Sequence, residues 1–433
     1  MGQSQQKPTA ATTSHTPSQP SHSEKFHQEI QHVLSVASSH NSSSSEKMSH
    51  SVTPSRPIPI IFDTDIGSDI DDALALLSLL NLPEEAVHIE GVTTVYGYVE
   101  IRSGVARRII QAHREDYPSL YDIPVRTGSN FPIGYPPVLP YWHAGTEGIG
   151  LFTHDQIEQM KSEQDCTLDR STLEKNHSKQ AAEFIVEKAR QWNGQLVIIS
   201  VGALTNVAMA LQMESNLPNL VNKVVFMGGG VFPHHEKVAL PLQPQKEYHC
   251  HSCHNMRQDQ FAANLVFSSG LTCYLVGHTV THDMWFTGDT VDQLRSLSFH
   301  TGTDPYTNDC VNFSHRDPNC KNSTHVVGTL LDVWLKHRTK IFHKNMNGTC
   351  PHDALTSYEA VWTGSFVEYV AGHFVVNEGT GETCFVGDEE GGHVHVAVKF
   401  RDGMVDRMMR LLSESLVRRI GWEELEGFGV KME

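Results

Sequence analysis

Long hydrophobic runs are the first thing that this chain of 433 residues lacks. No apolar stretch approaches the roughly 20 residues that a membrane-spanning helix needs, so we expect no membrane partner. The N-terminus also lacks the basic and then apolar layout of a secretory signal, which predicts a cytoplasmic protein. Cysteine is sparse, and eight Cys residues spread through so long a chain are typical of reduced thiols.

Positive charge is also in short supply. Lys and Arg number 33 against 50 Asp and Glu, which gives a net charge of −17. An excess of negative charge repels the phosphate backbone, so nucleic acid is excluded as the main partner. A small molecule is the expected ligand. The chain length suits one large doubly wound α/β domain or two smaller ones.

The polar composition of the first 56 residues sets them apart. Ser, Gln, His, Thr and Pro dominate residues 1–56, and such a segment cannot bury enough apolar surface to offset its ordering entropy. We therefore expect a disordered tail, followed by one domain over residues 57–433. Two irregular stretches, near 231–254 and 298–325, are expected to be insertions in that domain.

An acidic loop follows the first apolar run of the domain. The pattern predicts a buried strand ending at Asp63 and an amphipathic helix starting near Asp71. Five carboxylates fall within ten residues here, at Asp63, Asp65, Asp69, Asp71 and Asp72. Helix capping explains one of these residues but not five. Since crowded carboxylates repel one another, they indicate a site for a hard cation such as Ca²⁺ or Mg²⁺.

Strands and helices alternate after this loop. Strand patterns at 87–95, 123–127, 195–201, 221–227 and 271–276 are separated by helical patterns such as 99–112 and 179–192. This alternation predicts a parallel sheet with right-handed crossovers and helices on both faces. Ligands of such sheets bind beyond the carboxyl ends of the strands, where the acidic loop is expected to lie.

A second acidic motif lies far along the chain. Cys350-Pro351-His352-Asp353 precedes an apolar helical pattern and is typical of a helix start. A third motif, Gly202-Ala-Leu-Thr-Asn206, directly follows the strand pattern that ends at Val201. Taken together, these motifs are more specific than any one of them alone.

The three motifs, in this order, resemble those of the inosine-uridine-type nucleoside hydrolases. The likeness extends over about residues 57–425 and implies the fold of that family, a Rossmann-like, mostly parallel open sheet with helices on both faces. It also implies calcium-dependent hydrolysis of the N-glycosidic bond of a ribonucleoside, which yields ribose and a free nucleobase. Relatives in the family are commonly dimers or tetramers, so a homo-oligomer is expected.

The resemblance implies a role for each motif residue. The Ca²⁺ ligands are expected to be Asp65, Asp72, Asp353 and the backbone carbonyl of Val201. Asp65 matches the base that takes a proton from the attacking water, and His352 is expected to be the acid or donor beside the leaving nucleobase. Asp71 is expected to bind sugar hydroxyls. Because the acidic loop is two residues longer than usual, Asp69 is an alternative contact for metal or sugar.

Two positions depart from the family pattern. Gly97-Tyr98 stands where the family has Gly-Asn, so Tyr98 is the expected sugar contact there. Farther on, Asn255 aligns with a sugar-binding Asn, but Cys253 aligns with a Glu whose carboxylate a thiol cannot replace. The Cys250-x-x-Cys253 spacing also leaves a structural zinc site open as an alternative.

Two other functions stay open. A degenerate member of the family would bind a nucleoside-like ligand without hydrolysing it, which the two departures favour. A Mg²⁺-dependent phosphohydrolase would use Asp63 as its nucleophile, since such enzymes also begin with a strand that ends in Asp-x-Asp. That function leaves His352-Asp353 and the Gly202–Asn206 motif unexplained.

Overall fold

The computed structural model describes residues 57–133, 146–162, 179–230, 246–251, 253–287, 291–292, 294, 321–342, 348–378, 382–388 and 392–430. The expected tail over residues 1–56 and most of the two expected insertions lie outside these ranges. No helix within them is both long and apolar enough to cross a membrane.

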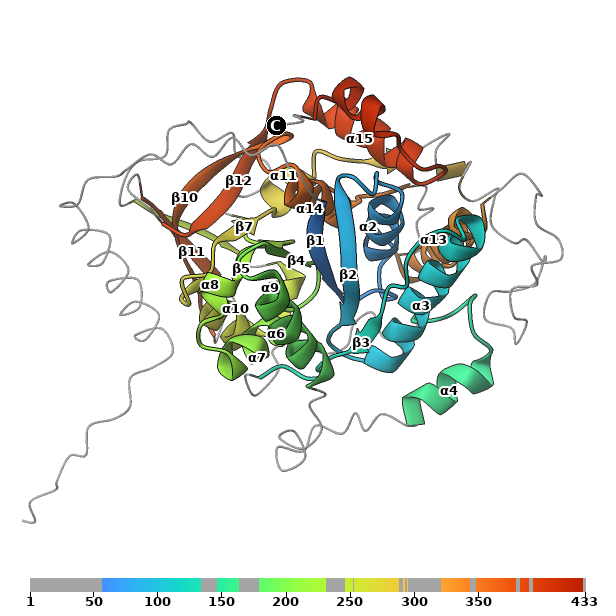
Figure 1. Cartoon of the computed structure of the whole chain (residues 1–433), viewed down its shortest axis with the longest axis horizontal. Helices are drawn as coiled ribbons and strands as arrows, with labels where there is room; N and C mark the ends of the chain where they lie inside the picture. The colour runs from blue at the N-terminus through green and yellow to red at the C-terminus, as the bar shows by residue number, and fades with distance from the viewer. Residues whose placement is uncertain are drawn as a thin grey trace, which may run out of the picture.

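A ten-stranded sheet forms the centre of the molecule (Figure 1). Its strand order is β3-β2-β1-β4-β5-β7-β12-β10-β11-β6. The seven strands from β3 to β12 pair in parallel, and β10, β11 and β6 continue the sheet antiparallel. This mostly parallel open sheet confirms the fold class expected from the sequence.

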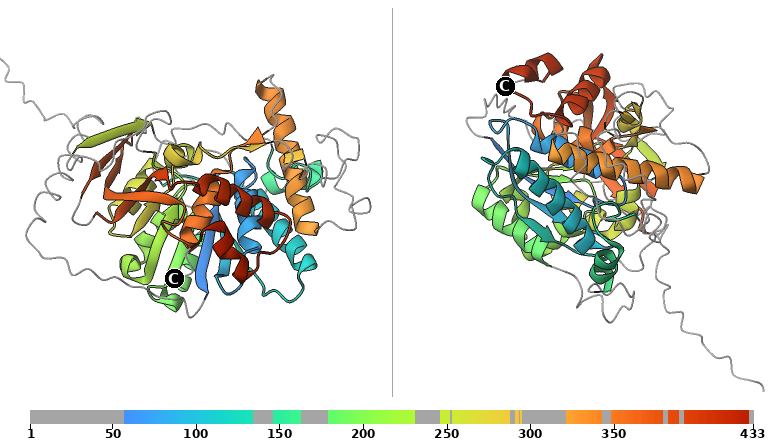
Figure 2. Two further views of the ribbon diagram at one scale, coloured as in Figure 1. Left: turned by 90° about the horizontal axis from the view of Figure 1, so that it is seen from above. Right: turned by 90° about the vertical axis from the view of Figure 1, so that its right-hand side faces the viewer.

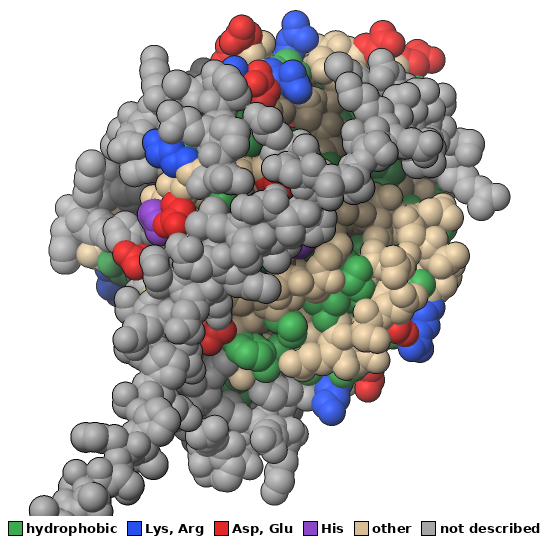
Figure 3. All heavy atoms as spheres, turned by 90° about the vertical axis from the view of Figure 1, so that its left-hand side faces the viewer, with side chains coloured by type: hydrophobic (Ala, Val, Ile, Leu, Met, Phe, Trp, Pro, Cys, Tyr) green, Lys and Arg blue, Asp and Glu red, His purple; other side chains and the backbone are tan. Residues whose placement is uncertain are grey.

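The strands are short, as is usual for buried parallel strands. They are β1 Ile58–Thr64, β2 Val87–Thr94, β3 Val125–Thr127, β4 Leu196–Ser200, β5 Val221–Phe226, β6 Glu247–His251, β7 Cys273–Leu275, β10 Val367–Val376, β11 Glu382–Gly387 and β12 Val394–Phe400. A separate two-stranded ribbon consists of β8 Phe286–Thr287 and β9 Gly348–Thr349. Figure 3 shows the face of the molecule toward the antiparallel end of the sheet, where described side chains of both charges lie mainly around the rim.

Helices cover both faces of the sheet. One layer holds α2 Asp71–Leu80, α3 Val99–Asp116, α13 Asn322–Phe342, α14 His352–Val361 and α15 Met404–Ser415. The other holds α6 Gln180–Trp192, α7 Thr205–Met213 and α10 Gln260–Phe267. Shorter segments complete the set: α4 His154–Ser162, α8 Leu217–Leu220, α9 His254–Gln258, α11 His278–Thr281 and the 3₁₀ helix η2 Trp422–Phe428. In the second view of Figure 2, α13 runs beside α3 on the outside of its layer.

Alternating strand side chains build two cores, one on each face. Ile60 and Phe62 of β1 pack into the core shared with α2, whereas Ile61 points into the core shared with α6. Each large apolar side chain that is removed from water in this way contributes about 1.5–3 kcal/mol. The strong apolar character of β1 therefore follows from burial on both faces.

The chain reverses direction across the sheet at β1. This strand pairs in parallel with β2 on one side and with β4 on the other. The chain adds β2 and then β3 on one side of β1 and afterwards returns to add β4 on the other side. The connections therefore run toward opposite edges of the sheet, which opens a crevice beyond the carboxyl ends of β1 and β4. The loop 65–70 and the start of α2 lie at this point.

Some elements differ from the sequence expectation. Helix α13 begins at Asn322, within the stretch near 298–325 that was expected to be an insertion, because the carboxylate of Asp116 accepts hydrogen bonds from the backbone N–H groups of Asn322 (2.7 Å) and Ser323 (2.9 Å). This cap comes from α3, far away in sequence. Glu247–His251, which fall in a stretch expected to be an insertion, form strand β6 at the sheet edge.

Candidate active site

A cavity of about 170 Å³ opens beyond the carboxyl ends of β1, β4 and β5. Its walls come from segments that are far apart in sequence: the acidic loop, the ends of these strands, α9, α11 and the start of α14. The lining residues are Asp65, Ser68, Asp69, Asp71, Asp72, Tyr96, Arg102, Glu147, Val201, Met227, Cys253, His254, Asn255, Gln258, His278, His352 and Asp353. All of the residues expected to bind metal or perform catalysis are among them.

Three buried carboxylates meet at the floor of this cavity. One oxygen each from Asp71, Asp72 and Asp353 lies within 4.8 Å of the others. Burial, and then the charges of the neighbouring carboxylates, raises the pKa of Asp71 and of Asp353 well above the usual value. The pKa of Asp72 is raised for the same two reasons, burial first and Asp65 second. Such a set of oxygen donors is suited to a hard divalent cation, which would offset the repulsion.

Two further carboxylates border this cluster. The amide of Gln258 donates a hydrogen bond of 2.9 Å to Oδ2 of Asp65 and so fixes the orientation of that carboxylate. Asp69 turns back and accepts a hydrogen bond of 2.6 Å from the backbone N–H of Ile70. Burial raises the pKa of Asp69 to about 6, although this hydrogen bond acts in the opposite direction.

Asp63, the first carboxylate of the motif, lies behind the cavity and does not line it. Its side chain is fully buried, and it accepts hydrogen bonds from Thr93 Oγ1 (2.6 Å), Asn206 Nδ2 (2.7 Å) and Ser200 Oγ (3.4 Å). Burial nevertheless raises the pKa of Asp63 to about 6. Asp63 thus ties together the ends of β1, β2 and β4 rather than contacting a ligand.

Asn206, the last residue of the Gly202–Asn206 motif, completes this arrangement. Its Nδ2 also donates to the carbonyl of Thr94 (3.0 Å), and its Oδ1 accepts from the N–H of Ser129 (3.0 Å). Gly202 allows the strand ends to approach, since a Cβ there would lie 2.9 Å from the backbone nitrogen of Asp65. The motif therefore positions the acidic loop.

Val201 and Asn255 meet at the wall of the cavity. Nδ2 of Asn255 donates to the carbonyl oxygen of Val201 (2.7 Å) and to that of Met227 (3.2 Å). A carbonyl oxygen has two lone pairs, so this bond leaves one for another partner. The bonds through Nδ2 leave Oδ1 of Asn255 as the acceptor for a ligand. Cys253 lies beside them and is buried, with 5% of its surface exposed.

His352 stands between this cavity and a second one. Its Nδ1 lies 2.7 Å from Thr281 Oγ1 and 3.4 Å from Cys350 Sγ. Burial, and then the neighbouring imidazoles of His278 and His282, lowers the pKa of His352 well below its usual value. Thr281 lies in the short helix α11, which follows the end of β7.

The second cavity has a volume of about 320 Å³. Asp69 and His352 line both cavities, so the two cavities are neighbours that share these side chains. Its other lining residues are His282, Trp285, Trp334, Arg338, Gly348, Thr349 and Cys350. They include aromatic rings, a guanidinium group and a thiol. Aromatic walls provide flat surfaces for a planar ring, whereas the first cavity is dominated by carboxylates.

Tyr98, expected to contact a sugar, does not line either of these cavities. It is the residue before helix α3, and its ring lies 5.5 Å from Nζ of Lys161 in α4. Tyr96 lines the first cavity instead. Its backbone has φ of +61°, which is rare for a residue with a Cβ, and burial raises the pKa of its hydroxyl to about 12. Tyr96 and Gly97 both have positive φ, and this left-handed turn precedes Tyr98.

Sequence reasoning also missed Gln258 and Arg102. Arg102 donates to the carbonyls of Tyr96 (2.7 Å) and Ile66 (3.1 Å) and to Ser68 Oγ (2.8 Å), so it fixes the loop on both sides of the cavity. A buried Arg on an otherwise amphipathic helix was the available signal for it. Gln258 had none, since its position depends on how α9 packs against the sheet.

Comparisons with known proteins agree with this arrangement. A family model described as inosine-uridine preferring nucleoside hydrolase matches residues 60–409. The chain is 30% identical over 250 residues to a probable uridine nucleosidase 2 of Oryza sativa subsp. japonica and 31% identical over 237 residues to uridine nucleosidase 1 of Arabidopsis thaliana. These alignments cover 57% and 54% of this chain and 64% and 60% of the two relatives, which is less than two thirds of their length.

Solved structures show the same fold. A plant nucleoside hydrolase superposes with a TM-score of 0.54 at 21% identity, covering 83% of this chain and 99% of that one. A purine-preferring ribonucleoside hydrolase from Gardnerella vaginalis superposes with a TM-score of 0.55 at 23% identity, covering 83% and 98%.

Proposed function

The chain belongs to the inosine-uridine preferring nucleoside hydrolase family, and we propose from this that it hydrolyses the N-glycosidic bond of a ribonucleoside to ribose and a free nucleobase. The observation that carries the proposal is the meeting of Asp71, Asp72 and Asp353 beside Asp65 in one cavity, although nearly 300 residues separate the two motifs along the chain. Cleavage of this bond passes through an oxocarbenium-like sugar, which neighbouring carboxylates stabilise.

We propose Ca²⁺ as the cofactor of this cavity. Four buried carboxylates and a backbone carbonyl are hard oxygen donors, and Ca²⁺ accepts six to eight such ligands in a flexible geometry. The residues that would hold it are Asp65, Asp72, Asp353 and the carbonyl of Val201, and the short separation of Asp71 from Asp72 and Asp353 makes Asp71 a further candidate. When bound, the ion would orient a water molecule and lower the pKa of that water.

Asp65 is proposed as the base of the reaction. Its Oδ2 accepts the hydrogen bond from Gln258, which leaves Oδ1 to take a proton from the attacking water. Asp65 lines the cavity and is shielded from bulk solvent, since 8% of its surface is exposed. Gln258 therefore serves as a positioning residue for Asp65.

His352 is proposed as the donor to the leaving nucleobase. Its lowered pKa makes the imidazole neutral near pH 7, so it relieves charge on the leaving nitrogen by donating an N–H hydrogen bond. The contact between Nδ1 and Thr281 holds the ring at the border of the two cavities. This placement supports a nucleobase in the aromatic second cavity and a ribose in the acidic first one.

Asp69, Asp71 and Asn255 are proposed to bind the sugar. Carboxylate oxygens accept hydrogen bonds from vicinal hydroxyls, and Oδ1 of Asn255 supplies a neutral acceptor on the opposite wall. Tyr96 replaces Tyr98 in this set, since it is the tyrosine that lines the cavity.

The decisive experiment is an assay of ribose release from uridine and inosine by the purified protein, with and without a chelator. We expect turnover that stops with the chelator and returns with Ca²⁺. No turnover of any nucleoside, together with binding in calorimetry, would favour the degenerate binder, for which the buried Cys253 in the cavity is the supporting observation.

A phosphohydrolase is disfavoured. Its nucleophile would be Asp63, which is fully buried behind the cavity and already accepts three hydrogen bonds. Release of phosphate from p-nitrophenyl phosphate in the same preparation would overturn this argument.

We also propose a cytoplasmic location and a homo-oligomer. Four cysteines among the described residues, Cys253, Cys273, Cys350 and Cys384, are buried free thiols, which suits a reducing compartment. Light scattering of the purified chain tests the oligomer, and fractionation of cells tests the location.

A further inference from the structure

Three histidines form a cluster, of which the proposed reaction uses only His352. Ligating nitrogens of His278, His282 and His352 lie within 4.8 Å of one another, and each side chain is partly exposed. We propose that this cluster is a second metal site of the protein, which binds a transition-metal ion such as Zn²⁺ and blocks the reaction when occupied.

The geometry of the rings supports the site. The ring centroids are 4.7 Å apart for His278 and His282, 5.0 Å for His278 and His352, and 5.4 Å for His282 and His352. Imidazoles that bind one tetrahedral Zn²⁺ at about 2.0 Å have centroids roughly 5 Å apart. Adjustment of side-chain rotamers is therefore enough to bring the nitrogens onto one ion.

Two elements hold the cluster together. His278 is the first residue of α11 and His282 directly follows its last residue, so the two are four residues apart and lie on the same side of that helical turn. His352 comes from the start of α14, and its Nδ1 contacts the hydroxyl of Thr281. A hydrogen bond to one ring nitrogen fixes the orientation of the ring and reserves the other nitrogen for a metal.

The chemistry of the donors separates this site from the acidic cluster. Imidazole nitrogen favours Zn²⁺, Co²⁺, Ni²⁺ and Cu²⁺, whereas carboxylate oxygen favours Ca²⁺ and Mg²⁺. Three imidazoles also leave one tetrahedral position for water or another ligand. His278 and His352 line the first cavity, and His282 and His352 line the second, so the cluster borders both cavities.

Another possible metal cluster, Glu247, His249 and Cys384, is a less suitable site. Burial raises the pKa of the Cys384 thiol to about 12, and metal binding requires the thiolate. His249 already lies 3.1 Å from the carboxylate of Glu247. His249 therefore provides a matched control, because it is a histidine in the competing cluster.

Occupation of the site has a consequence for catalysis, which rests on the proposed function. A metal bound to His352 takes the nitrogen that would otherwise donate to the leaving nucleobase. Zn²⁺ is thus expected to inhibit a protein that Ca²⁺ activates, and excess Ca²⁺ is not expected to reverse the inhibition.

The experiment titrates the full-length protein with Co²⁺ in the presence of saturating Ca²⁺ and follows the visible absorption of the cobalt. We expect one Co²⁺ per chain with the intense bands of tetrahedral coordination, displaced by Zn²⁺. His282→Ala and, separately, His278→Gln are each expected to weaken Co²⁺ binding at least about tenfold. His249→Ala is expected to leave it unchanged.

Thermal unfolding of each variant verifies that it folds. Absence of Co²⁺ binding to the Ca²⁺-loaded protein, or binding that both variants leave intact, would overturn the proposal, and so would loss of binding in His249→Ala alone. The absorption readout does not depend on turnover. Cleavage without Co²⁺ binding therefore counts against this site only, and Co²⁺ binding without cleavage counts against the proposed function only.

Discussion

Asp63 and Asp353 are both buried carboxylates at the carboxyl ends of the sheet, but their surroundings differ. Asp63 accepts hydrogen bonds from three polar side chains, and its pKa rises only to about 6. Asp353 faces other carboxylates, and burial, followed by the charge of Asp71, raises its pKa well above the usual value. Three hydrogen-bond donors stabilise the buried carboxylate of Asp63, whereas the carboxylates around Asp353 need a cation to offset their repulsion.

This difference distinguishes a carboxylate that supports the fold, Asp63, from one that belongs to the candidate active site, Asp353. A buried group with its hydrogen bonds satisfied stabilises the fold, whereas a crowded and repulsive group is retained at a cost in stability. Perturbed pKa values at functional sites have this origin. The following predictions test whether the two carboxylates have these separate roles.

The largest effect is expected for Asp353→Ala. Loss of this carboxylate removes a proposed Ca²⁺ ligand, and we expect kcat/KM for nucleoside cleavage to fall at least about 10³-fold. The fold is expected to remain intact, as judged by circular dichroism and thermal unfolding. Activity retained in this variant would remove Asp353 from the metal site.

The second prediction concerns Ca²⁺ and pH. Because the folded-state pKa values of Asp71, Asp72 and Asp353 lie above the unfolded value of 3.8, the metal-free folded chain binds more protons than the unfolded chain. Its stability is therefore expected to fall as the pH rises above about 4 toward neutrality. Ca²⁺ at 100 times its Kd should restore about 2.7 kcal/mol near pH 7.

Thermal unfolding measured across this pH range, with Ca²⁺ and with a chelator, checks the prediction. Asp353→Asn serves as the control, since it removes one charge at constant size and should flatten the pH dependence of the metal-free protein. Stability that is the same in Ca²⁺ and in chelator would show that the cluster does not bind the ion.

Asp63→Asn tests the other half of the comparison. The amide keeps one acceptor but turns an NH₂ group toward donors such as Thr93 and Asn206, so it leaves buried groups unpaired. We expect a loss of about 2 kcal/mol in the free energy of unfolding, measured in urea at pH 7. Metal-free Asp353→Asn should lose nothing under the same conditions, and an equal loss in both variants would contradict the distinction.

Local sequence patterns predicted the elements that carry both carboxylates. The strand before Asp63, the helix that begins at Asp71 and the helix that begins at His352 follow from apolar periodicity and acidic starts, and the structure has all three. Their convergence could be inferred because the carboxyl ends of parallel strands share one edge of the sheet.

The residues that sequence reasoning missed depend on contacts between distant segments. Gln258 reaches Asp65 across 193 positions, and Asp116 caps α13 across more than 200. No pattern within a window of the sequence encodes such pairs. Sequence reasoning did not find Tyr96, which lines the first cavity, for a different reason: the positive φ at Tyr96 is a strained conformation that propensities do not predict.

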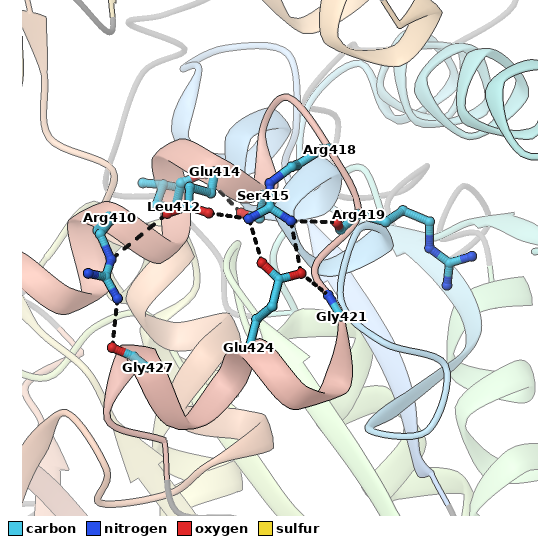
Figure 4. Close-up of polar contacts among 9 residues, drawn as sticks. All are labelled: Arg410, Leu412, Glu414, Ser415, Arg418, Arg419, Gly421, Glu424 and Gly427. Atoms are coloured by element: carbon cyan, nitrogen blue, oxygen red, sulfur yellow. Dashed lines mark hydrogen bonds and ion pairs between the residues drawn. The ribbon is translucent and has the colours of Figure 1, made fainter.

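The smallest effect is expected at a third kind of carboxylate, the surface residue Glu424. It accepts hydrogen bonds from Arg418 (2.6 Å) and from the backbone N–H of Gly421 (2.9 Å), which join η2 to the segment between α15 and η2 (Figure 4). The hydrogen bonds from Arg418, first, and from Gly421 lower the pKa of Glu424 to about 2, so its contribution is present above the unfolded pKa of 4.5 and is lost as the pH falls toward 2.

This sign is opposite to that of Asp353, but solvent screens the pair, because 42% of the Glu424 side chain is exposed. Glu424→Gln keeps an acceptor for Gly421 and is expected to cost less than about 1 kcal/mol in the free energy of unfolding at pH 7. Urea unfolding of the variant and the wild type measures this difference. A loss as large as that of Asp63→Asn would mean that hydrogen-bond donors stabilise a carboxylate equally well in water and in the core, and burial would then not account for the larger effect expected at Asp63.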